Sequence, residues 1–378
     1  MKLKLAVLSL AFFIPLLGFS QSKAMDYHLI IGTYTKTQNN GLFVYKFNTE
    51  TGKLSFESKT EGVVNPSYLA INNDATKVYS VSEAEGKQSG VSAFNFDAKN
   101  GVLSFINSQP TTSPGPCHVT LSKDGKFAFS ANYGGGSLSV FPIKGDGSLA
   151  PVSQLIKHAG NSIDKKRQNE PHVHSTTFSP DGSILYVADL GTDFVNAYKY
   201  NGNEKQPLTS EKSSDIKVAL GFGPRHFTFN KKGDKLYVMN EMKPYVSVFD
   251  YKNNKATLLQ EINSNATDFK GEDGGADIHL SNDGKFLYTT NRGTANNIGI
   301  FKIEKNGKLT KVGNESTKGK GPRNFAIDPT DNFLLVGHQY TDDIFVFRRD
   351  QKTGLLSFTG EKINVGSPVC LKFVEVKN

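Results

Sequence analysis

One segment of about 50 residues recurs seven times along the chain, and this repeat constrains the fold more than any other feature. Each copy starts at a turn resembling Gly-Pro or Asn-Pro and continues with a short apolar strand, a polar turn and a second apolar strand. A third strand ends in an apolar–aromatic pair, and a fourth strand carries one leucine per copy: Leu54, Leu103, Leu149, Leu208, Leu258, Leu309 and Leu356. No amphipathic helix separates these strands, which excludes parallel βαβ units. Four short strands per repeat are typical of a propeller blade.

The two ends of the chain predict how the ring of blades closes. Residues 27–35 have the pattern of a second strand without a first, and residues 367–376 have the pattern of a first strand without a second. We therefore expect an all-β, seven-bladed β-propeller with four antiparallel strands per blade, whose last blade is closed by the N- and C-terminal strands. No linker interrupts the repeat, so residues 21–378 are expected to form a single domain.

The first 20 residues have the pattern of a secretory signal peptide. Lys2 and Lys4 precede an apolar run over residues 5–19, and small residues follow near Ser20. No later segment is long and apolar enough to span a bilayer, so we expect no membrane span after cleavage. The pattern predicts a periplasmic or secreted protein, with an uncleaved N-terminal anchor as the alternative.

Composition excludes several classes of protein. The net charge of +8 comes from 44 basic and 36 acidic residues that are scattered among loops, so we expect no nucleic-acid partner. Two cysteines exclude a disulfide scaffold and a cysteine-rich zinc site, and we expect no disulfide between Cys117 and Cys370. The chain has no phosphate-binding loop, no Gly-x-Ser-x-Gly elbow and no His-Glu-x-x-His motif.

Superposition of the repeats predicts which side chains converge on the central channel. One position of the first strand is occupied by Ser67, Cys117, His174, Arg225, Ala276, Arg323 and Val369. The residue that follows the second strand forms another ring, made of Tyr34, Glu83, Tyr133, Leu190, Glu241, Arg292 and Gln339. Packing does not require repeated cations at one position, so the two rings indicate a polar pocket.

The pocket is expected to hold three arginines, Arg225, Arg292 and Arg323, flanked by His174 and Glu241. Clustered guanidinium groups bind carboxylate or phosphate, and a histidine beside a glutamate suits acid–base chemistry. The alternative is a structural polar network that plugs the channel. Two loops, at residues 157–171 and 263–275, are longer than their counterparts and are expected to cover the site.

Several motifs in order resemble the seven-bladed lactonase family, which includes the bacterial propeller-type 6-phosphogluconolactonases and is related to the fungal carboxymuconate cyclase. The motifs are Gly-Thr-Tyr-Thr at 32–35, Gly-Pro-Cys-His at 115–118, Glu-Pro-His-Val-His-Ser at 170–175 and Gly-Pro-Arg-His at 223–226. The resemblance covers essentially the whole chain after the signal segment. It implies a lactone hydrolase similar to 6-phosphogluconolactonase, which opens a sugar-acid lactone to the hydroxy acid.

The resemblance also implies a set of catalytic residues. The family's histidine, glutamate and two arginines match His174, Glu241, Arg225 and Arg292, which also lie in the two rings. The substrate is expected to be a small anionic sugar lactone, and neither a metal nor a cofactor is expected. Contacts with that substrate are expected from the remaining polar candidates: Arg323, His172, Tyr133 and Gln339.

The acid–base roles, the substrate and the class of function stay open at this point. The residues do not assign acid and base between His174 and Glu241, and the export signal leaves open an unphosphorylated lactone. A cycloisomerase acting on a muconate-type lactone would use the same residues. The third possible function, after the lactone hydrolase and the cycloisomerase, is a non-catalytic propeller that binds an anionic ligand or a protein. Because propellers close on themselves, we expect a monomer.

Overall fold

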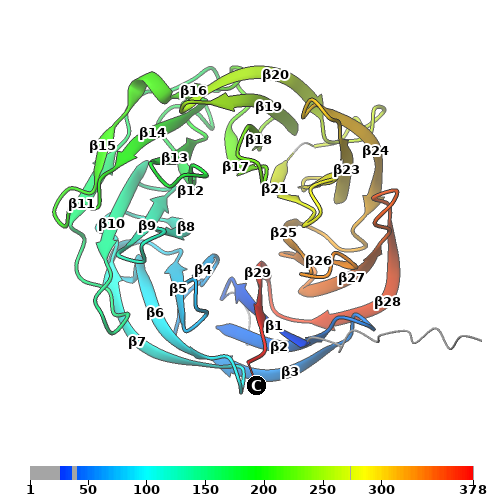
Figure 1. Cartoon of the computed structure of the whole chain (residues 1–378), viewed down its shortest axis with the longest axis horizontal. Coiled ribbons are helices and arrows are strands. Elements are labelled where there is room, and N and C mark those ends of the chain that lie inside the picture. The colour runs from blue at the N-terminus through cyan, green and yellow to red at the C-terminus, as the bar shows by residue number, and fades with distance from the viewer. Residues whose placement is uncertain (1–25, 36–40, 273, 378) are drawn as a thin grey trace, which may run out of the picture.

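The computed structural model describes residues 26–35, 41–272 and 274–377, which form a ring of seven β-sheets around a central channel (Figure 1). The predicted all-β, seven-bladed propeller is confirmed. Residues 1–20, for which a signal peptide is expected, lie outside the described residues. Within the described part, no helix has the length and hydropathy needed to traverse a bilayer.

The two inner layers of the ring are short strands that are largely buried. The innermost strands, which surround the channel, are β4 (Leu69–Ile71), β8 (Pro116–Leu121), β12 (Val173–Phe178), β17 (Pro224–Phe229), β21 (Gly275–Leu280), β25 (Pro322–Ile327) and β29 (Pro368–Glu375). Their antiparallel partners are β5 (Lys77–Ser82), β9 (Phe127–Asn132), β13 (Ile184–Asp189), β18 (Lys235–Asn240), β22 (Phe286–Asn291), β26 (Phe333–His338) and β1 (Asp26–Thr33).

The two outer layers complete each blade. The third strands are β6 (Gly90–Asp97), β10 (Ser137–Pro142), β14 (Phe194–Tyr200), β19 (Tyr245–Lys252), β23 (Asn297–Ile303), β27 (Asp343–Arg349) and β2 (Leu42–Asn48). The outermost strands are β7 (Val102–Pro110), β11 (Gln154–Lys157), β15 (Leu208–Ser210), β20 (Lys255–Asn263), β24 (Leu309–Ser316), β28 (Leu356–Asn364) and β3 (Leu54–Thr60).

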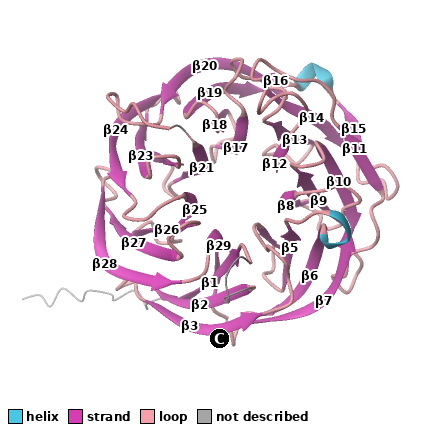
Figure 2. Ribbon diagram, turned by 180° about the vertical axis from the view of Figure 1, so that it is seen from behind, coloured by secondary structure: helices cyan, strands magenta, loops and turns pink. Residues whose placement is uncertain are grey.

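One blade departs from four strands, because the two-residue strand β16 (Ile216–Lys217) also pairs with β14. Two short 3₁₀ turns, η1 (Gly86–Gln88) and η2 (Lys212–Ser214), are drawn in cyan in Figure 2. The extra strand extends the blade of β12–β15 without altering the ring.

The closing blade joins the two ends of the described chain, as predicted. β29 pairs with β1 from Tyr27↔Glu375 to Thr33↔Pro368, so the sheet order is β29-β1-β2-β3. The C-terminal strand therefore occupies the innermost position of a blade whose other three strands come from the N-terminus. Both terminal strands are therefore paired within one sheet, and neither is left as an isolated strand.

The polar residue that ends each innermost strand fixes the following turn. Its side-chain oxygen accepts a hydrogen bond from the backbone N–H five residues later, at 3.0 Å for Ser179 and Ile184 and at 2.6 Å for Asp328 and Phe333. Six blades share this bond, through Asn72, Ser122, Ser179, Asn230, Ser281 and Asp328. Short polar side chains close such turns on their own backbone, which explains the Ser, Asn or Asp found there in every one of these copies.

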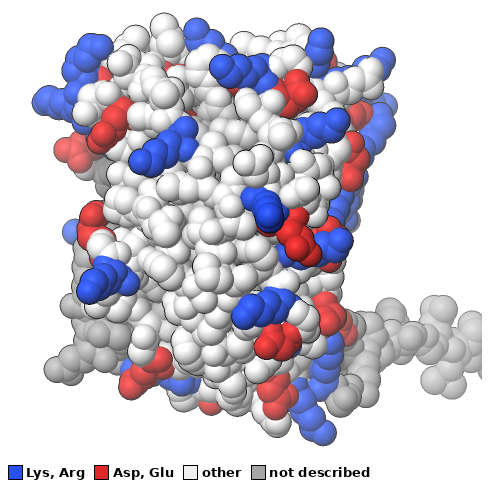
Figure 3. Space-filling model, turned by 90° about the vertical axis from the view of Figure 1, so that its left-hand side faces the viewer, with Lys and Arg blue, Asp and Glu red and all other residues white. Residues whose placement is uncertain are grey.

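The hydrophobic core is divided among the seven interfaces between neighbouring blades. Each of seven clusters of buried side chains takes residues from two adjacent sheets. The cluster at the closing blade, for example, packs Leu29 and Leu371 against Phe333 and Val346. On the outer wall, basic and acidic side chains are interspersed (Figure 3). Burial between blades thus holds the ring, and the wall carries mixed charge.

The expected leucines lie in the outermost strand in six blades; Leu149 is the exception, and Leu258 lies in its strand at a shifted register. Leu149 lies in an isolated bridge to Ile143, ahead of the outermost strand of its blade. Leu258 lies inside β20 and is 53% exposed, and Ala256 takes the position opposite Tyr251 instead. The two-residue turn Asn253–Asn254 is responsible, because both residues have positive φ and the tight hairpin starts β20 early.

We expect closure of the ring to carry a large share of the stability. Leu371→Ala in β29 removes a side chain that is 2% exposed and should lower the free energy of unfolding by roughly 2–5 kcal/mol. The matched change Leu258→Ala, at a position 53% exposed, should cost less than about 0.5 kcal/mol. Denaturant midpoints of the two variants and the wild type measure this. Equal effects of the two changes would contradict a core that depends on closure.

Candidate active site

A β-bulge places one side chain of the innermost strand at the mouth of the channel. In six blades the register between the innermost and second strands shifts by one extra residue near the start of the innermost strand. The extra residues are Cys117, His174, Arg225, Ala276, Arg323 and Val369. A bulge redirects the side chain of its extra residue. The repeat position identified from the sequence is therefore a structural feature of the propeller.

A repeated backbone hydrogen bond positions the second ring. The residue after each second strand donates its backbone N–H to a carbonyl oxygen of the innermost strand's leading turn, two residues before the first-ring residue of the same blade. The distance is 2.7 Å from Glu241 to Gly223 and 2.6 Å from Arg292 to Gly274. All seven blades make this bond, through Tyr34, Glu83, Tyr133, Leu190, Glu241, Arg292 and Gln339. The two rings thus share one end of the channel.

The carboxylate of Glu241 is the centre of the candidate site. Its Oε2 lies 3.0 Å from Arg225 Nε and 2.9 Å from Arg292 Nη2, and its Oε1 lies 2.7 Å from Arg167 Nη2. Arg167 also donates to Tyr133 Oη at 3.1 Å. Three guanidinium groups thus surround one carboxylate, which leaves the cluster positively charged.

Burial and these charges determine the protonation states. Burial alone would raise the pKa of the Glu241 carboxyl, but the guanidinium groups around it, Arg292 first, hold that pKa well below its usual range. Burial, with Arg292 next, lowers the pKa of Arg225 to about 10, so this guanidinium remains charged at neutral pH. Burial also lowers the pKa of His174 well below the ordinary histidine value, and Arg225 adds to this effect. At neutral pH the site therefore holds a carboxylate, three cations and an uncharged imidazole.

His174 lies beside Glu241 and against the aromatic ring of Tyr133. Its Nε2 is 3.9 Å from Glu241 Oε2, and its ring meets that of Tyr133 edge to face at 5.5 Å. His172 stacks on the same Tyr133 ring at 4.6 Å, and its Nδ1 lies 3.2 Å from the Tyr133 carbonyl oxygen. His172 thus supports Tyr133, and Tyr133 contacts both the imidazole and the Arg167 guanidinium.

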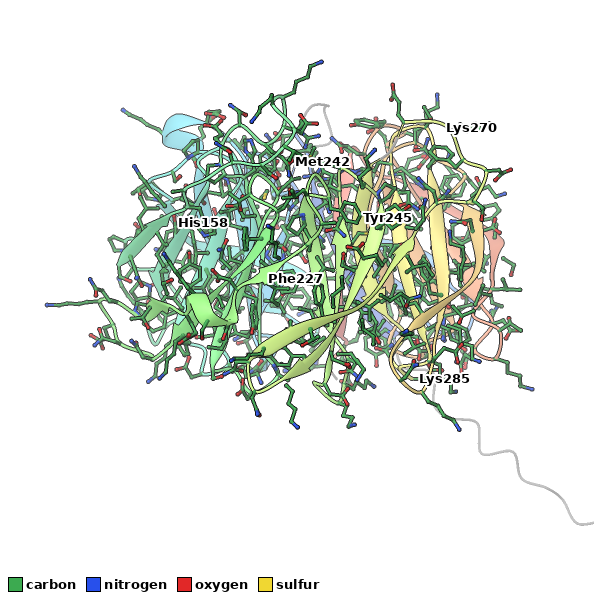
Figure 4. All side chains as sticks on the ribbon, turned by 90° about the horizontal axis from the view of Figure 1, so that it is seen from above. His158, Phe227, Met242, Tyr245, Lys270 and Lys285 are labelled. Carbon is green, nitrogen blue, oxygen red and sulfur yellow. The ribbon has the colours of Figure 1, made fainter. Side chains whose placement is uncertain are left out.

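A cavity of about 500 Å³ opens beside the cluster, lined in part by Arg167, Glu241, Met242, Arg292 and Tyr340. Met242 lies toward one face of the ring and Lys285 lies at the opposite face (Figure 4). The site is therefore at one mouth of the channel. A cavity of this size accommodates a small ligand.

The loop that carries Arg167 is anchored by one buried carboxylate. Asp193 accepts hydrogen bonds from Ser162 Oγ at 2.5 Å and from Gln168 Nε2 at 2.8 Å. The same carboxylate accepts the backbone N–H groups of Gly221 at 2.7 Å and Gly223 at 2.8 Å. Asp193 therefore holds the Arg167 loop against the turn that leads into Arg225.

Comparison with known proteins agrees with this architecture. The sequence profile of the family described as "Lactonase, 7-bladed beta-propeller" matches residues 28–373. The chain belongs to the seven-bladed β-propeller lactonase family. That membership makes it a lactone hydrolase, as the resemblance of its motifs implied.

Named relatives of this lactonase come from several bacteria. It is 36% identical to 6-phosphogluconolactonases of Formosa agariphila and Bacillus subtilis, over 91% of this chain in each case and 98% and 97% of theirs. A solved Bacteroides fragilis protein, provisionally assigned as a 6-phosphogluconolactonase, is 42% identical with a TM-score of 0.89, covering 93% of this chain and 98% of that one. A Pseudomonas aeruginosa periplasmic gluconolactonase is 34% identical with a TM-score of 0.89, covering 93% of this chain and 100% of that one.

The structure brings most of the candidate residues of this lactonase together. His174, Glu241, Arg225 and Arg292 form one cluster, and Tyr133 and His172 lie against it. Arg323 lies in the blade next to that of Arg292, and its charge helps to lower the pKa values of His174 and Arg225, but its ion pair is with Glu83 and not with Glu241.

Arg323 belongs to a second polar group at the same mouth. Its Nη2 is 3.9 Å from Glu83 Oε1 and its guanidinium lies 5.3 Å from the centre of the Tyr34 ring. Tyr34 Oη and Ser67 Oγ also donate to Glu83. Gln339 makes no contact with the Glu241 cluster among the described residues, and its side-chain oxygen is buried without a hydrogen-bond partner in that part of the chain. Arg323 and Gln339 remain candidates for substrate contact at this mouth of the channel.

Arg167 is the functional candidate that the sequence reasoning missed. It lies in the loop whose surplus length was noted, but that loop has no counterpart in the other blades, so superposition of the repeats cannot align it. The usable signal is an arginine within an insertion expected to cover the site. Among the described residues, no group of three or more His, Cys, Asp or Glu side chains is placed to hold a metal ion.

We expect Glu241 to hold the buried cations in place. Glu241→Gln leaves Arg225 and Arg292 without their counter-charge and should lower the free energy of unfolding at pH 7 by about 3–5 kcal/mol. Because the pKa of Glu241 is depressed in the folded protein, its stabilisation is present above the unfolded-state pKa of about 4.3 and is lost as pH falls toward the folded value. The difference in the free energy of unfolding between Glu241→Gln and the wild type should therefore decrease as the pH falls.

Denaturant unfolding at pH 7 and at successively lower pH measures this effect. Glu304→Gln is the matched control, since Glu304 forms an outer pair with Lys302 at 3.6 Å that should contribute less than about 1 kcal/mol. A loss at Glu241 no larger than at Glu304 would contradict the role of this carboxylate as the counter-charge.

Proposed function

We propose that this lactonase hydrolyses a sugar-acid lactone, with His174 as general base and the arginines beside Glu241 as the groups that stabilise negative charge. The observation that carries the proposal is the neutral, buried imidazole of His174, held 3.9 Å from the Glu241 carboxylate that lines the cavity together with Arg167 and Arg292. A general base must be unprotonated at the working pH, and the surroundings of His174 favour that state.

The contacts of the two groups favour His174 over Glu241 as the base. Glu241 is ionised, but its carboxylate oxygens already bind the guanidinium groups of Arg225, Arg292 and Arg167, which leaves them less available to accept a proton. Its carboxylate instead lies where it stabilises the imidazolium that forms when His174 takes a proton. A base oriented and supported by a carboxylate is a recurrent arrangement in acyl-transfer sites.

The reaction balances with these groups alone. His174 accepts a proton from water while the water oxygen attacks the lactone carbonyl carbon, and the carbonyl oxygen becomes an oxyanion beside the guanidinium groups. The ring C–O bond then breaks, and His174 returns the proton to the leaving oxygen. The product is an open-chain hydroxy acid, which ionises to its carboxylate and releases one proton to solvent. Arg292 lines the cavity, and its Nε–H has no partner within the described residues, which supports a role in binding a substrate oxygen.

The substrate is proposed to be anionic, and Arg167 is proposed to recognise its charge. The side chain of Arg167 is 46% exposed and lines the cavity from the inserted loop, so it can contact a phosphate at the mouth of the channel. Guanidinium groups bind phosphate through bidentate hydrogen bonds. The names of the Formosa and Bacillus relatives support a 6-phosphogluconolactone, whereas the name of the Pseudomonas relative supports an unphosphorylated gluconolactone.

We further propose that residues 1–20 direct export and that residues 21–378 act as one monomeric propeller outside the cytoplasm. The charged start and apolar run of the N-terminal segment support export. The periplasmic gluconolactonase at 34% identity supports the same location.

His174→Gln should lower kcat/KM for the lactone by roughly 100-fold or more, because it removes the general base. In the wild type, kcat/KM should be flat between about pH 6 and 8 and should fall only in acid, since the pKa of His174 is well below 6.5 and the base is lost only when it is protonated. Acid release at constant pH, corrected for spontaneous ring opening, measures both.

The matched control is His28→Gln, which changes a buried histidine that pairs with Glu57 at 2.6 Å, distant from the site along the chain and in a different blade. Its kcat/KM should stay close to wild type. Near-normal hydrolysis by His174→Gln would remove His174 from the mechanism. The same assay with a muconolactone distinguishes the cycloisomerase reading.

Arg167→Met should raise KM for 6-phosphogluconolactone by roughly tenfold or more while changing KM for gluconolactone far less, because only the first carries the phosphate. Lys165→Met in the same loop is the control of equal charge change and should alter neither. Initial rates on both lactones give the two ratios. An equal effect of Arg167→Met on both substrates would show that Arg167 acts through Glu241 and not on a phosphate.

A further inference from the structure

The channel has a second chamber at the end opposite the lactonase site. The innermost strands start beside that site, at a bulge in six of the seven blades, and run toward the other face, where Lys285 lies (Figure 4). A cavity of about 450 Å³ opens among the far halves of β4, β8, β12 and β29. No residue of the proposed catalytic cluster lines it.

The lining of this chamber is polar and carries positive charge. Its polar members include Lys372, Tyr68, His118, Thr120 and Thr177, and no Asp or Glu occurs among its described lining residues. His118 stacks on Tyr68 at 4.0 Å, which fixes both rings at the inner wall. A smaller cavity of about 170 Å³ shares Tyr68, His118 and Thr177 with it, and Asp277 is the one carboxylate among the described residues that line this smaller cavity.

Lys372 is a partly buried cation without a matching anion. Its Nζ lies 3.4 Å from Tyr68 Oη and 4.7 Å from the centre of the Tyr68 ring, and it forms no ion pair with a carboxylate among the described residues. Tyr68 and Cys370 are uncharged at neutral pH, since burial raises the pKa of Tyr68 to about 12 and that of Cys370 to about 11. A cation in such a setting is normally paired.

The one carboxylate that acts on Lys372 is already occupied. Asp277 influences the ammonium from beyond ion-pair distance. Its Oδ1 lies 2.7 Å from His226 Nδ1, its Oδ2 lies 2.9 Å from His279 Nε2, and Asn324 Nδ2 also donates to it. Asp277 therefore serves its own hydrogen-bond network on the neighbouring strands, and the Lys372 ammonium keeps donors for a further acceptor.

We propose that this far chamber is a second ligand site, in which Lys372 binds a small oxyanion of the phosphate or carboxylate class. The hydroxyl groups of Thr120 and Thr177 and the imidazole of His118 line the same cavity and supply hydrogen bonds to the remaining oxygens. The site is independent of which lactone is hydrolysed at the other mouth. Its charge and size exclude a large or cationic ligand.

Binding of inorganic phosphate and of gluconate to the mature chain, each titrated by calorimetry and by thermal unfolding, tests the proposal. Phosphate or gluconate should raise Tm of the wild type, and Lys372→Met should weaken that binding by roughly tenfold or more. Arg292→Met removes a cation from the lactonase site and should leave the far-site binding in place. The two anions distinguish a phosphate site from a sugar-acid site.

Two matched variants separate binding from folding. Lys302→Met removes an exposed lysine on an outer strand and should leave anion binding unchanged. Lys372→Arg keeps the charge and should retain a measurable shift in Tm with phosphate. Without anion, Lys372→Met should be no less stable than wild type, because it removes an unpaired cation, and its kcat/KM for the lactone should stay within about twofold of wild type.

Three results would overturn the proposal. One is anion binding by Lys372→Met as tight as that of the wild type. Another is binding that disappears in Arg292→Met, which would assign the anion to the lactonase site. The third is a Lys372→Met protein that is less stable without anion yet keeps its full anion-dependent shift, which would make Lys372 a structural cation.

Discussion

The β-bulge at the start of the innermost strands is the constraint on which the site depends. Regular pairing would fix the direction of every side chain by the alternation of the strand, whereas the extra residue is released from the ladder. The backbone bond from the second ring to the turn before the bulge then brings Glu241 next to Arg225 within a single blade. Because neighbouring blades repeat both features, His174 and Arg292 arrive beside that pair from either side.

The electrostatics of the cluster follow from burial on this scaffold. Arg225 is 1% exposed, so its charge depends on Glu241 and on the Ala276 carbonyl oxygen, which accepts from Nη1 at 2.7 Å. The same burial that makes Arg225 depend on its partner keeps His174 uncharged. One low-dielectric pocket therefore stabilises a carboxylate and a neutral base at once, which is the combination that general-base hydrolysis requires.

The ring, its closure and most of the cluster were predictable from the sequence because they repeat. Six copies aligned on one polar turn residue identify the bulge position, and in all six blades that residue makes the same turn bond in the structure. Features without a counterpart in other copies were not accessible. The Arg167 loop occurs once, and the register at Leu258 depends on a two-residue turn that only this blade has at that place. The pairing of Arg323 with Glu83, and not with Glu241, depends on distances in three dimensions that the repeat does not give.

The bulge position also shows that the charges of the site are not there to build the fold. Val369 and Ala276 occupy in two blades the position that Arg225 and Arg323 occupy in others, and the register shift is present around each of them. The propeller thus accepts an apolar or a charged residue at the same backbone position, because the cores that hold the ring lie between blades, away from it. A buried arginine at a position that alanine also fills has to be explained by what it binds, and in this protein chemistry at the mouth of the channel provides that explanation.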